Sequence, residues 1–132
     1  MKTKTLVSLV LLIASIALAG CTTLADATQA RGKGTKVTYQ ASFEELWKTM
    51  PDTITAIGLR FVSANRDDQS VLALRGFTFL SDGENVAIFI EKNGDARSTV
   101  EVVSIKVVKT DLGATNWTKP IFEALDKKFK RA

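Results

Sequence analysis

The chain has 132 residues, of which 24% are charged and 45% hydrophobic, and its formal net charge is +4. This length allows one domain with one modest core. The sequence contains no histidine, which excludes Ser-His and Cys-His nucleophile systems and removes the commonest ligand of zinc and copper. The net positive charge is too small to indicate nucleic-acid binding, so we expect no nucleic acid among the partners.

The first 20 residues have the layout of a secretory signal peptide. A short basic start precedes an uncharged apolar run from Leu6 to Ala19, which ends in small residues. The run is shorter than the roughly 20 residues of a membrane-spanning helix. Ala17-Leu18-Ala19 would allow ordinary cleavage and release of a soluble protein, which is one of two alternatives.

The other alternative is lipid attachment. Leu18-Ala19-Gly20-Cys21 closely resembles the bacterial lipobox, and Cys21 is the sole cysteine. The resemblance implies cleavage between Gly20 and Cys21, a diacylglycerol thioether on Cys21 and acylation of the new amine, with palmitate as an expected acyl group. A single cysteine cannot form an internal disulfide. Several acyl chains on one residue would hold a protein stably on a membrane. Thr22, by resemblance to enterobacterial sorting, implies the periplasmic face of the outer membrane rather than the inner membrane.

The residues after the cysteine predict a spacer and then a domain. Residues 22–35 are small and polar and include two glycines, which favours a flexible linker that spans roughly 20 Å. We therefore predict a lipoprotein signal peptide over residues 1–20, a lipidated Cys21 with a flexible tether over 21–35, and one domain over 36–132. Removal of residues 1–20 lowers the net charge to +2.

The domain is expected to begin with a strand and a helix. Alternating apolar residues over 36–41 predict a half-buried strand. Ser42 and Glu45 have the spacing of a capping box, and apolar residues then recur at helical pitch. The stripe keeps its phase across Pro51, so we predict one kinked helix over 42–57 that ends at Gly58.

Four strands are expected next, at residues 59–66, 70–80, 85–92 and 98–108. Asn93-Gly94 predicts a type I′ hairpin turn. In the last strand the apolar phase shifts, and a bulge near Val102-Val103 would keep the apolar set on one face. Gly76 leaves two alternatives in the strand over 70–80. With a bulge at Gly76, Phe77 and Phe79 share a face with Leu72 and Leu74, and without one they lie on the opposite face.

A final helix over 116–130 completes the order β-α-β-β-β-β-α. This order predicts a two-layer α+β fold, with a single antiparallel sheet, two helices on one face, and the first strand beside the last. The element order, the spacing and the Tyr39-Gln40-Ala41-Ser42-Phe43 entry into the helix resemble small bacterial envelope lipoproteins with a helix-grip-like domain. The domains of the C subunit of the β-barrel assembly machinery are similar in outline. The resemblance implies no catalytic residue.

The polar residues of the domain give no catalytic or metal-binding pattern. The acidic turns at residues 67–68 and 82–84 lack the periodicity of a calcium loop. Glu91 and Glu101 are expected as cross-strand surface residues rather than a hydrolytic pair. Trp47 and Trp117 lie on apolar helix stripes and are expected in the core. We predict no metal, no cofactor and no enzymatic activity.

The sheet face without helices carries the candidate partner-contact residues Phe77, Phe79 and Phe89. They are either ordinary scattered apolar residues or a contact patch for an envelope protein or a second copy. We expect a non-catalytic interaction or structural lipoprotein that uses the open face or an edge strand. The alternative is a periplasmic carrier of small apolar ligands, which predicts a cavity under the helix that contains Trp47.

Overall fold

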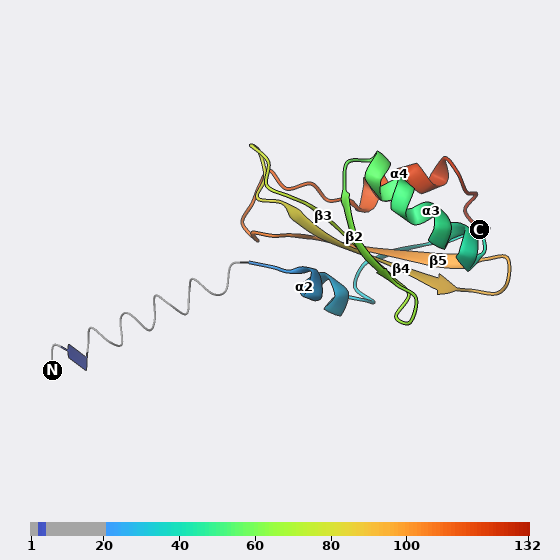
Figure 1. The fold of residues 1–132 in the computed structure, drawn as a ribbon, viewed down its shortest axis with the longest axis horizontal. Helices are drawn as coiled ribbons and strands as arrows, with labels where there is room; N and C mark the ends of the chain where they lie inside the picture. The colour runs from blue at the N-terminus through green and yellow to red at the C-terminus, as the bar shows by residue number, and fades with distance from the viewer. Residues whose placement is uncertain (1–2, 5–20) are drawn as a thin grey trace.

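The computed structural model describes residues 3–4 and 21–132, so the predicted signal peptide, with Gly20, lies almost entirely outside the described residues. From Cys21 onward the elements are α2 (Leu24–Gln29), β1 (Thr35–Tyr39), α3 (Phe43–Ala56), β2 (Arg60–Asn65), β3 (Ser70–Arg75), β4 (Glu84–Lys92), β5 (Ser98–Lys106) and α4 (Thr118–Asp126) (Figure 1). In the part of the chain that the structure describes, no helix is long and apolar enough to cross a membrane.

The strands form one antiparallel sheet in the order β1-β5-β4-β3-β2. The predicted α+β class and the predicted place of the first strand beside the last are therefore confirmed. Val37 on β1 lies opposite Val100 on β5. The outer edge of β1 is paired with the C-terminal residues, because Ala132 N donates to Thr38 O at 2.9 Å.

The larger core lies between the sheet and the helices α3 and α4, which cover the same face (Figure 1). α3 begins as predicted, because Glu45 N donates to Ser42 Oγ at 3.2 Å and Ser42 N donates to Glu45 Oε2 at 2.8 Å. The helix continues through Pro51. Gly58 has a φ of +96° and ends the helix in a conformation that favours glycine.

The second face of the sheet is covered by α2, in the segment where a flexible linker was expected. α2 has its own capping box, in which Asp26 N donates to Thr23 Oγ1 and Thr23 N donates to Asp26 Oδ2. The buried side chain of Ala27 packs in a second apolar cluster, whose other buried members are Ala87, Phe89 and Val103. Residues 24–29 are therefore a packed part of the fold, which corrects the tether predicted over 21–35.

This second cluster also explains the apolar phase of β5. The strand pairs with β4 without a register shift from Ser98 to Lys106, so the bulge expected near Val102-Val103 is absent. Val102 belongs to the larger core and Val103 to the second cluster. Adjacent residues of a strand point to opposite faces, and both faces of β5 are buried, so consecutive valines need no bulge.

One strand end, one hairpin turn and one helix end differ most from the prediction. β3 ends at Arg75, so neither alternative for Gly76 holds, and Phe77 and Phe79 lie in the β3–β4 loop. The β4–β5 hairpin has a longer loop than a type I′ turn, since Lys92 pairs with Ser98. α4 stops at Asp126 because the chain then turns to pair with the outer edge of β1.

Candidate functional site

Cys21, the predicted lipid-attachment residue, lies directly against the end of the sheet. It forms an isolated antiparallel bridge with Val108, just beyond β5, and its side chain is exposed. Thr22 N donates to Val107 O at 2.8 Å, and the Thr22 hydroxyl donates to Lys106 O. Asn85 Nδ2 donates to Thr22 O at 3.1 Å. Cys21 is therefore fixed to the domain with no spacer between them.

The chain pairs first with Val108, just beyond β5, at Cys21 and then with β5 along β1, and α2 packs on the second face between these two pairings. Glu101 binds the loop between α2 and β1. Its Oε1 accepts from Gly32 N at 2.6 Å and from Gly34 N at 2.9 Å. A side chain at Gly34 would collide with the Val102 carbonyl. Glu101 is therefore a buried structural residue and not the surface residue that was expected.

Phe89 is closed off from partners, which corrects its place in the predicted contact face. It is 1% exposed, beneath α2 and the Arg31 guanidinium, which lies 4.7 Å from the ring centroid. Arg31 is fixed there by Glu91, at 3.0 Å, and by the backbone carbonyl of Asp68, at 2.7 Å. Removal of this cover would be needed before Phe89 could contact another molecule.

Phe77 and Phe79, in contrast, are largely exposed. Thr78 and Ser81 exchange backbone hydrogen bonds of 2.7 and 3.4 Å, so Phe79 and Leu80 occupy the corner of a tight turn. Leu112 projects from the β5–α4 loop. We call these four residues the apolar tip; their exposed fractions are 80% for Phe77, 98% for Phe79, 75% for Leu80 and 96% for Leu112.

A buried carboxylate organises the two loops that carry the apolar tip. Glu84 is 0% exposed, and it accepts from Ser81 Oγ at 3.0 Å, Thr115 N at 2.6 Å and Trp117 Nε1 at 3.3 Å. A charge buried so deeply needs such partners. Glu84 therefore joins the β3–β4 loop to the β5–α4 loop and to the core tryptophan.

Asp111 makes a second connection between the same loops. Its Oδ2 accepts from Asp82 N at 2.8 Å and lies 3.0 Å from Ser81 Oγ, whose single hydroxyl hydrogen is shared between Asp111 and Glu84. The Asp82 N–H, followed by that of Gly113, holds the pKa of Asp111 below its ordinary value, because both bonds favour the charged carboxylate. Gly113 lies so close to the Leu80 carbonyl that a side chain would not fit.

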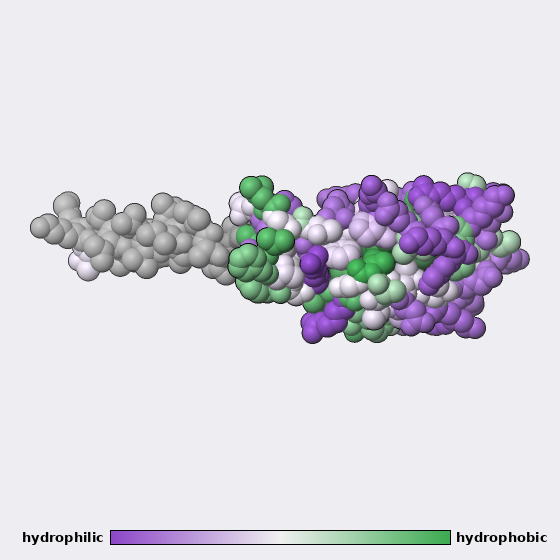
Figure 2. Space-filling view, turned by 90° about the horizontal axis from the view of Figure 1, so that it is seen from above, coloured by the Kyte–Doolittle hydropathy of each residue, from purple (hydrophilic) through white to green (hydrophobic). Residues whose placement is uncertain are grey.

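Cys21 and the apolar tip lie at the same end of the domain. In Figure 1 the described chain begins at the end of the sheet from which the β3–β4 and β5–α4 loops project, and the C-terminus lies at the opposite end. Figure 2 shows apolar residues gathered at this end, while the opposite end is mostly hydrophilic. The fold thus brings Phe77 and Phe79 near Cys21 and separates them from Phe89.

Sequence reasoning missed four residues of this region: Leu80 and Leu112, which belong to the apolar tip, and Glu84 and Glu101, which hold loops in place. The two leucines carried a local signal, because each is a large apolar residue inside a turn sequence, Phe-Leu-Ser-Asp-Gly and Asp-Leu-Gly. The local sequence signal of the two glutamates was weaker. Glu101 has valine on both sides in a strand whose two faces are apolar.

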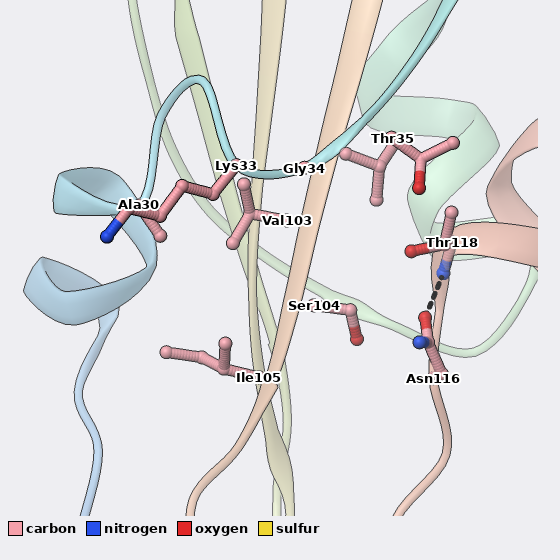
Figure 3. Close-up of a pocket in the computed structure, with 10 residues that line it drawn as sticks. Ala30, Lys33, Gly34, Thr35, Val103, Ser104, Ile105, Asn116 and Thr118 are labelled. Atoms are coloured by element: carbon pink, nitrogen blue, oxygen red, sulfur yellow. Dashed lines mark hydrogen bonds between the residues drawn. The ribbon is translucent and has the colours of Figure 1, made fainter.

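Three pockets among the described residues lie away from the space beneath α3. One, of about 240 Å³, is lined by the loop before β1, by β5 and by the start of α4 (Figure 3). Two of its polar side chains already have partners, since Ser104 Oγ accepts from Trp117 N and Asn116 Oδ1 accepts from Thr118 N. Beneath α3, Leu46, Met50 and Ile54 are fully buried in the larger core. This packing does not favour the carrier alternative.

Within residues 3–4 and 21–132, no group of three or more acidic or cysteine side chains is placed to hold a metal ion. Trp117 is buried as expected, whereas Trp47 is half-buried and stacks on Phe43, with ring centroids 5.3 Å apart. No protein-family model matches the chain. A search of curated proteins finds no match either.

Proposed function

We propose that the chain is a membrane-anchored bacterial lipoprotein that acts as a non-catalytic interaction or structural module in the cell envelope. The signal peptide is cleaved before Cys21, the cysteine is acylated, and the mature chain is sorted to the periplasmic face of the outer membrane. The domain belongs with the helix-grip-like envelope lipoproteins that its element order resembles. The observation that carries the proposal is the exposed Cys21, which the bonds of Thr22 fix at one end of the sheet.

The roles of the buried carboxylates support a non-catalytic module. Glu84 and Glu101 are the two buried acidic residues of the described chain, and in a cleft such groups would be candidates for acid–base chemistry. Here both accept hydrogen bonds from the backbone amides of loops. Their hydrogen bonds hold loops in place against the sheet, and neither residue lines a described pocket.

The partner-binding surface of this module is the outer edge of β2. β2 pairs only with β3 among the described residues, whereas the outer edge of β1 is occupied by the C-terminal segment. Phe61 and Val62 on β2 are 39% and 41% exposed. A free edge with exposed apolar side chains can take an added strand from another protein.

Mass spectrometry of the mature N-terminus tests the anchor. The full chain is expressed in a Gram-negative host, extracted in detergent and compared with the Cys21→Ala variant. We expect a triacylated chain that begins at Cys21 and fractionates with the outer membrane, and no acylation of the variant. A wild-type chain that begins at Gly20 and carries no acyl group would contradict the proposal.

A site-specific cross-link tests the partner surface. A photoreactive amino acid is placed at Val62 in intact cells, with the same amino acid at the exposed Glu123 of α4 as the matched control. We expect a discrete cross-linked envelope protein from position 62 only. Equal products from both positions, or none from position 62, would remove β2 as the interaction surface.

A further inference from the structure

The apolar tip presents four large side chains that nothing in the described chain covers. Phe77, Phe79, Leu80 and Leu112 are all largely exposed and come from two neighbouring loops. Single exposed apolar residues are common on protein surfaces. A group of four at one end of a small domain instead indicates contact with another apolar surface.

The tip is held outward by the polar bonds beneath it. Glu84 and Asp111 join the two loops through Ser81, and Gly113 lies against the Leu80 carbonyl. The loops therefore cannot fold back to bury their apolar side chains without breaking bonds to a buried carboxylate. A surface fixed in this way loses little conformational entropy when it binds.

The position of Cys21 identifies the occupant. The cysteine bridges to Val108, a few residues before Leu112, so it lies at the end of the domain that carries the tip (Figures 1 and 2). Acyl chains on Cys21 enter the bilayer from this end. Because Thr22 is bonded to the sheet, the domain cannot move away on a spacer, and the tip is brought to the membrane surface.

We propose that the apolar tip inserts into the bilayer boundary as a second, non-covalent attachment that fixes the orientation of the domain. This inference rests on the proposed lipid attachment at Cys21. The charged groups at this end are of both signs, because the exposed Lys106 and Lys109 line one surface pocket and Asp82 and Asp111 lie in the loops of the tip. Burial of apolar area rather than attraction to anionic headgroups therefore drives the insertion.

Fluorescence quenching in vesicles tests the insertion. The full chain is expressed, its mature N-terminus is determined, and it is incorporated into phosphatidylethanolamine–phosphatidylglycerol vesicles with or without brominated acyl chains. The Phe79→Trp variant reports on the tip, and Phe61→Trp on β2 is the matched control. Brominated lipid is expected to lower the emission of Phe79→Trp but not that of Phe61→Trp, beyond the background of the native tryptophans.

A partition measurement on a chain without acyl groups separates the tip from the anchor. The mature chain with Cys21→Ser is mixed with the same vesicles, and Phe79→Ser is expected to lower its partition coefficient by about tenfold, since one inserted phenylalanine is lost. Because Phe79 is almost wholly exposed, the circular dichroism spectrum and the urea midpoint should not change.

The outcomes separate the two proposals. An acylated chain whose Phe79→Trp emission is not quenched would overturn the insertion and leave the lipid anchor standing. A mature chain without acyl groups that is still quenched through Phe79→Trp would support the insertion and defeat the anchor. Self-association that depends on Phe79, without quenching by lipid, would identify the tip as a contact between copies and overturn the proposal.

Discussion

Replacement of Phe89 by alanine tests whether α2 is part of the folded domain. Phe89 is 1% exposed and packs with Ala27 and Val103, and the Arg31 guanidinium lies over its ring. Removal of a buried phenylalanine side chain costs about 3–5 kcal/mol. α2 is short and can settle into part of the space, so we expect the lower value, about 3 kcal/mol.

Urea unfolding followed by tryptophan fluorescence measures this loss. The chain begins at residue 21 and carries Cys21→Ser, so that no acyl group affects the transition. For a denaturant slope of about 2 kcal/mol per molar urea, the midpoint should fall by about 1.5 M. Phe79→Ala is the matched control, and because Phe79 is 98% exposed its effect should stay within about 0.5 kcal/mol.

The two substitutions give different results only if α2 covers the sheet. If residues 22–34 were a flexible linker, Phe89 would face water, and both variants would unfold near the wild-type midpoint. Equal, small shifts for Phe89→Ala and Phe79→Ala would therefore refute the packed α2 and restore the tether.

Three further predictions concern the loops. Glu101→Ala removes the acceptor of two glycine amides, so it should cost about 1–3 kcal/mol in urea unfolding and speed hydrogen exchange at those amides, with a smaller effect for Glu101→Gln. Gly113→Ala places a methyl group against the Leu80 carbonyl, so limited proteolysis should cut the β3–β4 loop faster, whereas Gly76→Ala, where a methyl group meets nothing within 4 Å, should leave the rate unchanged. The pKa of Asp111 is lowered in the folded chain, so its bonds stabilise the loops above the unfolded pKa of 3.8 and are lost as the pH falls through the lower folded value. NMR should show the Asp111 carboxyl titrating below pH 3.8, with the amides that donate to it losing protection over the same interval; a titration at or above 3.8 would contradict this.

The elements that could be predicted from sequence are those with local signals. The Ser42–Glu45 capping box and the apolar stripe after it define α3 within one segment, and Gly58 ends that helix in the left-handed conformation. The place of β1 beside β5 followed from the connectivity of antiparallel strands. In each case the residues that determine the structure are neighbours in sequence or follow one another in chain order.

α2 could not be predicted because its stability comes from distant residues. It is a six-residue helix with one buried side chain, Ala27, and helices of this length are not stable alone. Its partners on the sheet, such as Phe89 and Val103, are more than 60 positions later in the chain. The sequence held two signals, the Thr23–Asp26 capping pattern and the second apolar set on β5. Only the two together indicate a helix packed on the sheet face opposite α3 and α4.

The candidate site was predictable in part for the same reason. Cys21 was identified from a short local pattern. Its place at the same end of the domain as Phe77 and Phe79 depends on the bridge to Val108 and on the end of β3 at Arg75. The alternation of Phe77 and Phe79 with Thr78 is typical of a strand, and only the turn closed by Ser81 places both aromatic residues in a loop.

Under the proposed lipid attachment, the absence of a spacer after Cys21 would limit how far the domain reaches from a bilayer. β4 runs the length of the sheet with 9 residues, which corresponds to about 30 Å at the rise of an extended strand. The C-terminus lies at the end opposite Cys21 (Figure 1). If the proposed acylation of Cys21 is correct, the rigid sheet rather than the length of a flexible tether would set the distance from the membrane at which the domain can contact a partner.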